Sequence, residues 1–246
     1  MIYLFLLLIP ILGYYIVLVI KFKNNFNHSN VDTKNNKNIV PVSVIIAIKN
    51  GEASLPHLIE CLQNQTYKGD VEFILVDDQS TDKTKSIIQN IEIDDIRFKF
   101  VSSNSGDLDL KFKKKALDAG IKIANHEWLL FTDVDCRPPA TWVEEMVEYF
   151  IDDNDFVIGM SKVFPNKSTV SIFQSIDFQM LMAASFSQAN IGQPWACTGQ
   201  NQAYRKSLFN KVDGFKHISN LLQGDDSVFM QISVSRMRLC QKRNLK

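Results

Sequence analysis

The sequence predicts an α/β fold with a mostly parallel sheet that is flanked by helices. From Pro41 onward, short apolar runs alternate with segments whose apolar residues recur at helical spacing. The runs are rich in Val, Ile and Leu and lack polar alternation, which is typical of strands covered on both faces. Repeated strand–helix units of this length favour parallel strands joined by right-handed crossovers. A chain of 246 residues can hold one such domain and further segments.

The first two units are the most regular. The apolar run Val42–Ile48 is followed by Lys49–Glu52, and Ser54 is a suitable N-cap for a helix with Leu55, Leu58, Ile59 and Leu62 on one side. The second strand, Val71–Val76, ends in the acidic stretch Asp77–Asp82. A helix that carries Ile87, Ile88 and Ile91 follows it.

Three more strands follow the same pattern, at Arg97–Val101, Trp128–Thr132 and Phe156–Met160. The helix after the third strand presents Phe112, Ala116, Ala119 and Ile123, and the helix after the fourth presents Val143, Met146, Val147 and Phe150. Beyond them lies a long helical run rich in aromatic residues and Met, from Ser168 to Ala189, which we expect to pack mostly in the core. The alternatives are a wall for an acceptor or a surface that lies against the membrane.

The N-terminus predicts a membrane anchor. Residues 1–20 carry no charged side chain, and 20 helical residues span about 30 Å, the thickness of the hydrocarbon layer. Lys21 and Lys23 follow directly, which places the rest of the chain in the cytoplasm. We expect a single-pass membrane protein with a polar linker at 21–40, one folded domain at 41–235 and an irregular basic tail at 236–246.

Several functional classes lose support. Lys and Arg balance Asp and Glu at 27 each, so bulk charge does not indicate a nucleic-acid partner. The four Cys residues form no Cys-x-x-Cys pair, and no His-Glu-x-x-His motif is present. The first strand is followed by neither the phosphate loop of a Walker-type NTPase nor the Gly-x-Gly-x-x-Gly motif of a Rossmann dehydrogenase.

Acidic residues follow two predicted strands. Asp133 and Asp135 come directly after the fourth strand, and in an extended segment they point the same way, which suits a hard divalent cation. Asp77 to Asp82 follow the second strand. Because ligands of open α/β sheets bind beyond the carboxyl ends of the strands, both groups are expected on one rim. The alternative for Asp133 and Asp135 is a structural role at the end of a strand and the start of a helix.

Further polar residues could complete such a site. Lys111, Lys113, Lys114 and Lys115 begin the third helix, and we expect Lys114 or Lys115 to face the rim, the alternative being a solvated helix face. Asp225 and Asp226 precede the apolar run Val228–Ile232. One of them could cap that helix, or it could take a proton from an attacking hydroxyl.

Together these residues resemble the family-two glycosyltransferases of the GT-A fold, especially membrane-anchored bacterial members. Six motifs appear in family order between about Pro41 and Gln231: Val42–Asn50, Val76–Thr84, Lys114–Ile121, Phe131–Asp135, Thr198–Asn201 and Gly224–Asp226. The sequence departs mildly from the family at Asp225, where Glu is commoner, and at Asp118, where Asn is usual. Related enzymes carry a Gln-x-x-Arg-Trp motif and further membrane helices downstream, so we expect a C-terminally truncated member.

The resemblance implies inverting transfer of a sugar from a UDP- or GDP-sugar to a hydroxyl of a polysaccharide, glycolipid or lipid-linked glycan. It implies that Asp133 and Asp135 hold Mg²⁺ or Mn²⁺, that Asp77 and Asp78 hold the base and ribose, and that Asp226, next to Asp225, is the general base. The candidate residues for binding the nucleotide sugar are Ala47, Lys49, Asn50, Glu52, Asp77, Asp78, Ser80, Lys114, Lys115 and Asp133.

Two other functions stay open. The chain could be a catalytically dead remnant that binds a nucleotide sugar, which donor hydrolysis would distinguish. It could also be a nucleotidyltransferase, which would release pyrophosphate from a nucleoside triphosphate. The missing Gly-rich loop counts against the second alternative.

Overall fold

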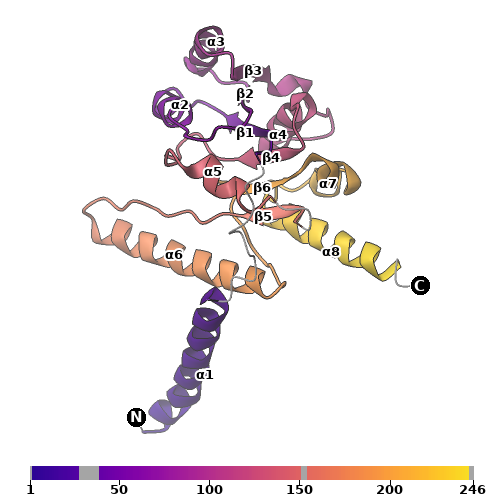
Figure 1. Cartoon of the computed structure of the whole chain (residues 1–246). Coiled ribbons are helices and arrows are strands. Elements are labelled where there is room, and N and C mark those ends of the chain that lie inside the picture. Colours follow the sequence, from indigo (N-terminus) through magenta and orange to yellow (C-terminus); the bar gives the residue numbers. More distant parts are fainter. Residues whose placement is uncertain (1, 28–38, 151–153, 244–246) are drawn as a thin grey trace. The chain divides into compact units, whose positions relative to one another are not determined.

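The structure is a computed structural model that describes residues 2–27, 39–150 and 154–243 (Figure 1). The chain divides into two compact units, one formed by residues 1–32 and 160–195 and the other by residues 33–159 and 196–246. The predicted domain at 41–235 is therefore interrupted by a segment that belongs to the smaller unit.

The larger unit is built on a six-stranded sheet with the order β3-β2-β1-β4-β6-β5. Strands β1 to β4 are parallel to one another, whereas β6 is antiparallel to both β4 and β5. The mostly parallel sheet is confirmed, and the order changes direction between β1 and β4, which makes a topological switch point there. The strands are β1 (Val42–Ile48), β2 (Val71–Asp77), β3 (Phe98–Ser102), β4 (Trp128–Phe131), β5 (Phe156–Ile158) and β6 (Gln202–Arg205).

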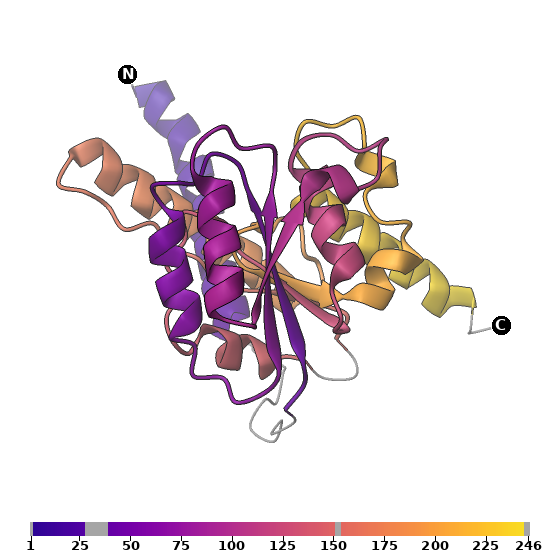
Figure 2. The same cartoon turned by 90° about the horizontal axis from the view of Figure 1, so that it is seen from above.

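Helices cover both faces of this sheet (Figure 2). One face packs against α2 (Leu55–Gln63), α3 (Thr84–Asp94) and α5 (Trp142–Val147). The other face packs against α4 (Phe112–Ile123), α7 (Lys206–Lys211) and α8 (Ser227–Arg243). The described part of this unit also contains two short 3₁₀ helices, η2 (Ser103–Ser105) and η3 (Lys216–Ile218).

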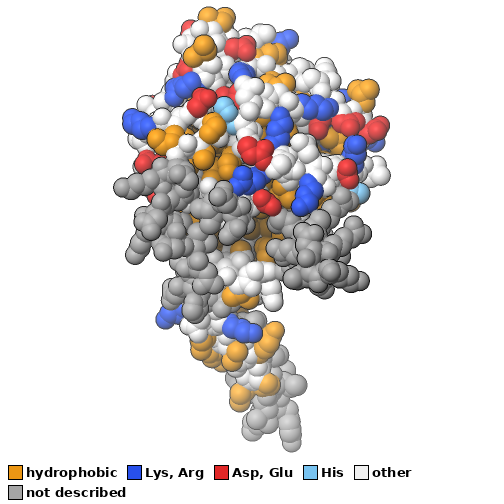
Figure 3. Space-filling view, turned by 45° about the vertical axis from the view of Figure 1, so that its right-hand side comes forward, with side chains coloured by type: hydrophobic (Ala, Val, Ile, Leu, Met, Phe, Trp, Pro, Cys, Tyr) orange, Lys and Arg blue, Asp and Glu red, His pale blue; other side chains and the backbone are white. Residues whose placement is uncertain are grey.

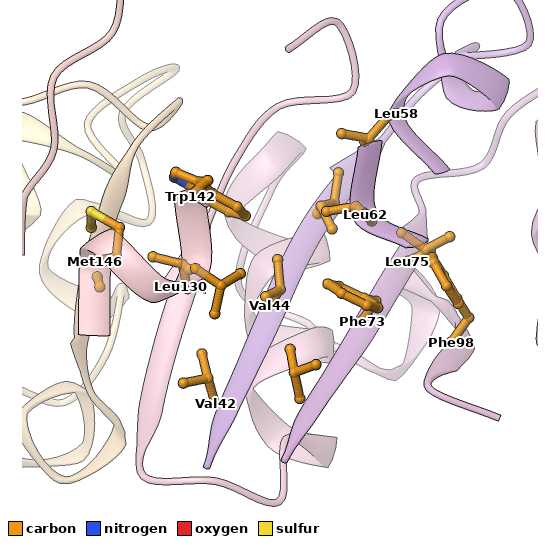
Figure 4. Packing of buried hydrophobic residues seen from close by; sticks show 14 of the residues in the cluster. Val42, Val44, Leu58, Leu62, Phe73, Leu75, Phe98, Leu130, Trp142 and Met146 are labelled. Carbon is orange, nitrogen blue, oxygen red and sulfur yellow. The ribbon is translucent and has the colours of Figure 1, made fainter. Parts of the chain in front are cut away.

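The hydrophobic core has two parts because side chains alternate along each strand. Val44 of β1 packs into the cluster with α2 and α5, together with the labelled Trp142 in Figure 4, whereas Ile45 faces the opposite cluster. On that second side, Gly120 lets α4 lie very close to the sheet, since a Cβ there would come within 2.6 Å of Ile45 Cγ2. The burial on both faces matches the unbroken apolar pattern of β1.

The smaller unit consists of α1 (Ile2–Asn27) and α6 (Thr169–Asn190), which contact each other. Ser168 caps α6 by accepting a hydrogen bond from the Ser171 backbone N–H. Core packing was expected for this run, but its large side chains are mostly exposed, including Phe173, at 68%, and Ile176. That expectation is wrong.

The two ends of the chain differ from what the sequence predicts. Within residues 2–27, 39–150 and 154–243, no helix is both long and apolar enough to cross a membrane, so the predicted span at 1–20 is not supported. The linker predicted at 21–40 begins too early, since α1 continues to Asn27, and residues 28–38 lie outside the described part. The tail predicted at 236–246 is helical to Arg243 because its residues are mostly good helix formers, and 244–246 lie outside the described residues.

Candidate functional site

The carboxyl ends of the parallel strands meet at one rim, as the sequence predicts. Asp77, the last residue of β2, pairs with Ile48 at the end of β1, and Phe131 at the end of β4 pairs with Ile45. β6 runs in the opposite direction, and its first residue, Gln202, pairs with Phe131. The loop before β6 therefore enters the sheet at the same rim as the loops after β1, β2 and β4.

The loops after β1 and β2 are fastened to each other. Asn50 donates its backbone N–H to Ser80 Oγ at 2.9 Å, and its side-chain oxygen accepts from the Thr81 N–H at 2.9 Å. Glu52 accepts a hydrogen bond from the Lys83 N–H at 3.1 Å. The buried Asp77 carboxylate accepts from the Ser80 N–H at 3.2 Å. The structure thus brings Asn50, Glu52, Asp77 and Ser80 together, with Ala47, Lys49 and Asp78 on the same two segments.

A lysine lies between the acidic residues of the rim. Lys113 Nζ is 2.6 Å from Asp133 Oδ1 and 3.6 Å from Asp225 Oδ2, and it also interacts electrostatically with Asp226. Burial lowers the pKa of Lys113, but the three carboxylates outweigh that effect, and the pKa is raised. Lys113 is therefore a full positive charge at neutral pH. Acidic and basic side chains are also intermingled on the face shown in Figure 3.

The two predicted lysines follow Lys113 on the same helix. Lys114 is buried, donates a hydrogen bond to the Leu221 carbonyl at 2.5 Å and also interacts electrostatically with Asp225. Lys115 packs against Gly106, where a Cβ would come within 2.2 Å of the Lys115 carbonyl oxygen. The lysine bonded to Asp133 is Lys113, which precedes the predicted pair.

Asp133 and Asp135 do not share an extended segment. The Cys136 N–H donates to the Asp133 carbonyl at 3.1 Å, which closes a turn directly after Asp133. The expected extended backbone from Asp133 to Asp135 is therefore wrong, and the two-residue repeat of a strand does not apply to this pair. Asp133 is partly buried beside Lys113, and Asp135 is exposed on the turn.

The start of α8 is joined to the loop before β6. Ser227 donates its hydroxyl to the Cys197 carbonyl at 2.9 Å and accepts from the Cys197 N–H at 3.1 Å. This places Gly199 against the acids, since a Cβ at Gly199 would lie 3.8 Å from Asp225 Oδ2 and 4.0 Å from Asp226 Cβ. The Asp226 carboxylate accepts from the Ser227 N–H at 2.5 Å, so Asp226 both starts the helix and faces the rim.

The same loop is also fastened from the other side. Trp142 Nε1 donates to Asn201 Oδ1 at 3.0 Å, and the Gly159 N–H donates to the Asn201 carbonyl at 2.9 Å. Sequence reasoning assigned no role to Trp142, and the signal that could have identified it is its position at the first turn of α5, directly after the rim. Burial, together with the nearby Asp226, raises the pKa of the Cys197 thiol well above its usual value, so Cys197 is not a thiolate nucleophile.

The carboxylates of the rim could contribute to a divalent metal site but do not form one alone. Within the described residues, no group of three or more His, Cys, Asp or Glu side chains could hold a metal ion by itself. Asp133 nevertheless binds a cation in this structure, the Lys113 ammonium. Mg²⁺ is usually held by one or two carboxylates together with phosphate oxygens of a substrate. Asp133 at the rim and Asp135, exposed on the adjacent turn, are carboxylates of the kind that such a site uses.

Comparison with known proteins gives a consistent picture. The model of a family described as Glycosyl transferase family 2 matches residues 43–213. A GalNAc(5)-diNAcBac-PP-undecaprenol beta-1,3-glucosyltransferase from Campylobacter jejuni is 38% identical over 95 residues, which are 38% of this chain and 29% of that protein. A chondroitin synthase from Pasteurella multocida is 24% identical over 184 residues, 74% of this chain and 18% of that protein. The chain thus spans less than a third of either relative.

Among solved structures, a mannosyltransferase from Pyrobaculum calidifontis in complex with GDP-Man and Mn²⁺ has a TM-score of 0.63 with this chain at 17% identity. The match covers 89% of this chain and 60% of that one. At this identity the likeness shows a shared GT-A fold.

Proposed function

Because this chain belongs to glycosyltransferase family 2, we propose that it transfers a sugar from a nucleotide-sugar donor to an acceptor hydroxyl. The observation that carries the proposal is the acidic rim. Asp133, which follows β4, and the adjacent Asp225 and Asp226, which precede α8, surround one lysine of α4 at the carboxyl rim of the sheet. A purely structural sheet has no need of three convergent carboxylates, which repel one another unless a cation offsets them.

The proposed reaction is a single displacement with inversion. The acceptor oxygen attacks the anomeric carbon of the donor sugar, and the bond from that carbon to the diphosphate oxygen breaks. Asp226 takes the proton of the acceptor hydroxyl as the new glycosidic bond forms. The products are the glycoside and the nucleoside diphosphate. The protonated Cys197 near this site supports a path without a covalent thiol intermediate.

The remaining roles follow the positions on the rim. Asp77 and Asp78 would hold the base and ribose at the end of β2, where the Asn50–Ser80 contact fixes the two loops. Asp133 and Asp135 would hold Mg²⁺ or Mn²⁺, which when bound neutralises charge on the leaving diphosphate. The GDP-Man complex supports a nucleotide-sugar donor, and the two named relatives support a glycan or lipid-linked acceptor. We infer a UDP- or GDP-sugar as the donor. The location predicted from the sequence, at the cytoplasmic side of a bacterial inner membrane, stays a prediction.

The test is binding of a panel of UDP- and GDP-sugars to the full chain, with and without Mn²⁺, by calorimetry. Three variants accompany the wild-type protein: Asp135→Ala and Asp133→Ala at the rim, and Asp94→Ala as a matched control at an exposed position on α3. We expect one donor to bind in the presence of Mn²⁺, and we expect the two rim variants, but not Asp94→Ala, to lose that binding.

Two other results would change the conclusion. Binding of no donor by the wild-type protein would contradict the proposed function. Metal-dependent binding without donor hydrolysis or transfer at high protein concentration would indicate the dead nucleotide-sugar-binding remnant instead.

A further inference from the structure

The Lys113 ammonium occupies the position beside Asp133 for which a bound metal ion would have to compete. Its ammonium lies 2.6 Å from Asp133 Oδ1 and 3.6 Å from Asp225 Oδ2, so Asp133 is the nearer of these two carboxylates. The ammonium fits closely against the loop before β6, since a Cβ at Gly199 would be 3.3 Å from Nζ. Lys113 thus sits at the meeting point of the β4 end, the β6 entry loop and the start of α8.

The backbone before Lys113 is unusual in a way that serves this placement. Phe112, the first residue of α4, has a φ of 56°, in the left-handed region that is costly for a bulky side chain. Its ring is 55% exposed, so burial of that ring gives little in return for the strain. What the conformation does achieve is to start α4 so that the following residue reaches Asp133. Strained backbone that yields no packing is typical of functional positions.

A lysine and a divalent ion cannot share one carboxylate oxygen, because the two cations repel each other strongly at such distances. A metal that binds Asp133 must therefore displace the Lys113 ammonium from Oδ1. The side chain can move, since 36% of it is exposed and its four-carbon stem is flexible. Asp225 and Asp226 keep the displaced ammonium near the rim.

We propose that Lys113 is the resident cation of this rim: it neutralises Asp133, Asp225 and Asp226 while the site is empty, and it moves from Asp133 to the donor's diphosphate when a divalent metal binds. The inference rests on the proposed function, because it needs a diphosphate as the second partner of the lysine. On this proposal, Lys113 weakens the binding of a metal ion in the absence of nucleotide. Once the metal is bound, Lys113 strengthens the binding of the nucleotide.

The opposite signs of these two effects provide the test. The affinity of the full chain for Mn²⁺ alone is measured by electron paramagnetic resonance, and the affinity for UDP and GDP at saturating Mn²⁺ by calorimetry. We expect Lys113→Met to bind Mn²⁺ about threefold to tenfold more tightly, because the substitution removes one positive charge that repels the metal. We expect it to bind the nucleoside diphosphate about tenfold more weakly, because the same charge attracts the diphosphate.

Two further variants serve as controls. Lys113→Arg keeps the charge, so its Mn²⁺ affinity should stay close to that of the wild-type protein. Lys111→Met removes a lysine two residues earlier at an exposed position and should change neither affinity. Mn²⁺ should also raise the melting temperature of Lys113→Met more than that of the wild type, because the stabilisation by a ligand increases with the logarithm of its affinity for the folded state.

A loss of both affinities in Lys113→Met, or no change in either, would overturn the proposal, since a merely structural lysine cannot change the two in opposite directions. That failure is distinct from failure of the proposed function. If the wild-type protein shows no metal-dependent nucleotide binding at all, the function itself is wrong, and the role of Lys113 falls with it.

Discussion

Glu72, at the edge of the sheet opposite the rim, is expected to stabilise the fold strongly. Its buried carboxylate accepts four hydrogen bonds, from Ser43 Oγ at 2.5 Å, from the Asn125 N–H at 2.7 Å, from Asn125 Nδ2 at 3.0 Å and from Lys99 Nζ at 2.5 Å. These bonds join β1, β2 and β3 to the loop that leads from α4 into β4. The perturbation we choose is Glu72→Gln, which preserves the size of the side chain.

The magnitude follows from this count. A glutamine amide turns one acceptor oxygen into a donor. In the better placement the amide NH₂ faces Ser43, whose hydroxyl can turn and accept, and the Asn125 N–H, which loses its acceptor. The bonds from Lys99 and Asn125 Nδ2 are kept but lose their charged acceptor. A hydrogen bond to a charged group contributes about 1.5–3 kcal/mol. The Lys99 side chain is 35% exposed and can turn toward water, which reduces the loss. We therefore expect the free energy of unfolding at pH 7 to fall by about 2–4 kcal/mol.

The effect should depend on pH in a defined direction. Burial raises the pKa of Glu72, but hydrogen bonds from Lys99, Ser43 and Asn125 outweigh it, and the folded-state pKa lies below the usual 4.5. A depressed carboxyl pKa contributes stability above the unfolded value, and this contribution is lost as the pH falls through the folded value. The difference between the wild type and Glu72→Gln should therefore be complete at pH 7 and shrink below about pH 4.5.

Urea unfolding followed by circular dichroism at a series of pH values measures this difference. Glu60→Gln, at an exposed position on α2, is the matched control and should change stability by less than about 0.5 kcal/mol. A similarly small effect of Glu72→Gln at pH 7, or a difference that stays constant below pH 4.5, would refute the reasoning.

Three further predictions concern the rim and the core. Asp226→Asn should reduce sugar transfer by about 10²–10⁴-fold, as expected for loss of a general base, while Mn²⁺-dependent donor binding measured by calorimetry is retained. Tyr204→Phe should leave the free energy of unfolding unchanged or raise it by up to about 1 kcal/mol, because the buried hydroxyl has no hydrogen-bond partner within the described residues; a clear loss in urea unfolding would show that it does bind something. Gly120→Ala should lower stability by about 1–3 kcal/mol, because the added Cβ would come within 2.6 Å of Ile45 Cγ2 and 3.0 Å of Val76 Cγ2. An unchanged melting temperature would mean that α4 can move away from the sheet without cost.

Much of the fold could be predicted from the sequence because local signals and tertiary packing agree there. The strands β1, β2 and β4 are mostly apolar, and each is buried on both faces as that pattern requires. β6 was not predicted, because Gln202–Arg205 is four residues long with polar ends. Its identity as a strand comes from pairing with β4 and β5, which are distant in sequence.

The sequence predicted which kinds of residues lie at the rim, but only part of the arrangement of their side chains. The acids were identified because they follow strands whose carboxyl ends must meet at one rim. The lysine bonded to Asp133 was not identified, because helical phase near a helix start depends on the first backbone angles, and the positive φ of Phe112 cannot be read from the residue type. The turn after Asp133 was missed for a similar reason, since a strand pattern does not say where the extended backbone ends.

The reversed strand explains why the rim can combine so many groups. In a wholly parallel sheet, the loop that enters a strand lies at the amino edge, away from the acids. Because β6 is antiparallel to β4, its entry loop lies instead at the carboxyl edge, next to Asp133. Gly199 in that loop has no side chain to exclude the Lys113 ammonium, and Ser227 joins the loop to the helix that carries Asp226. One change of strand direction thus brings the proposed metal ligand, the resident cation and the proposed base to the same place.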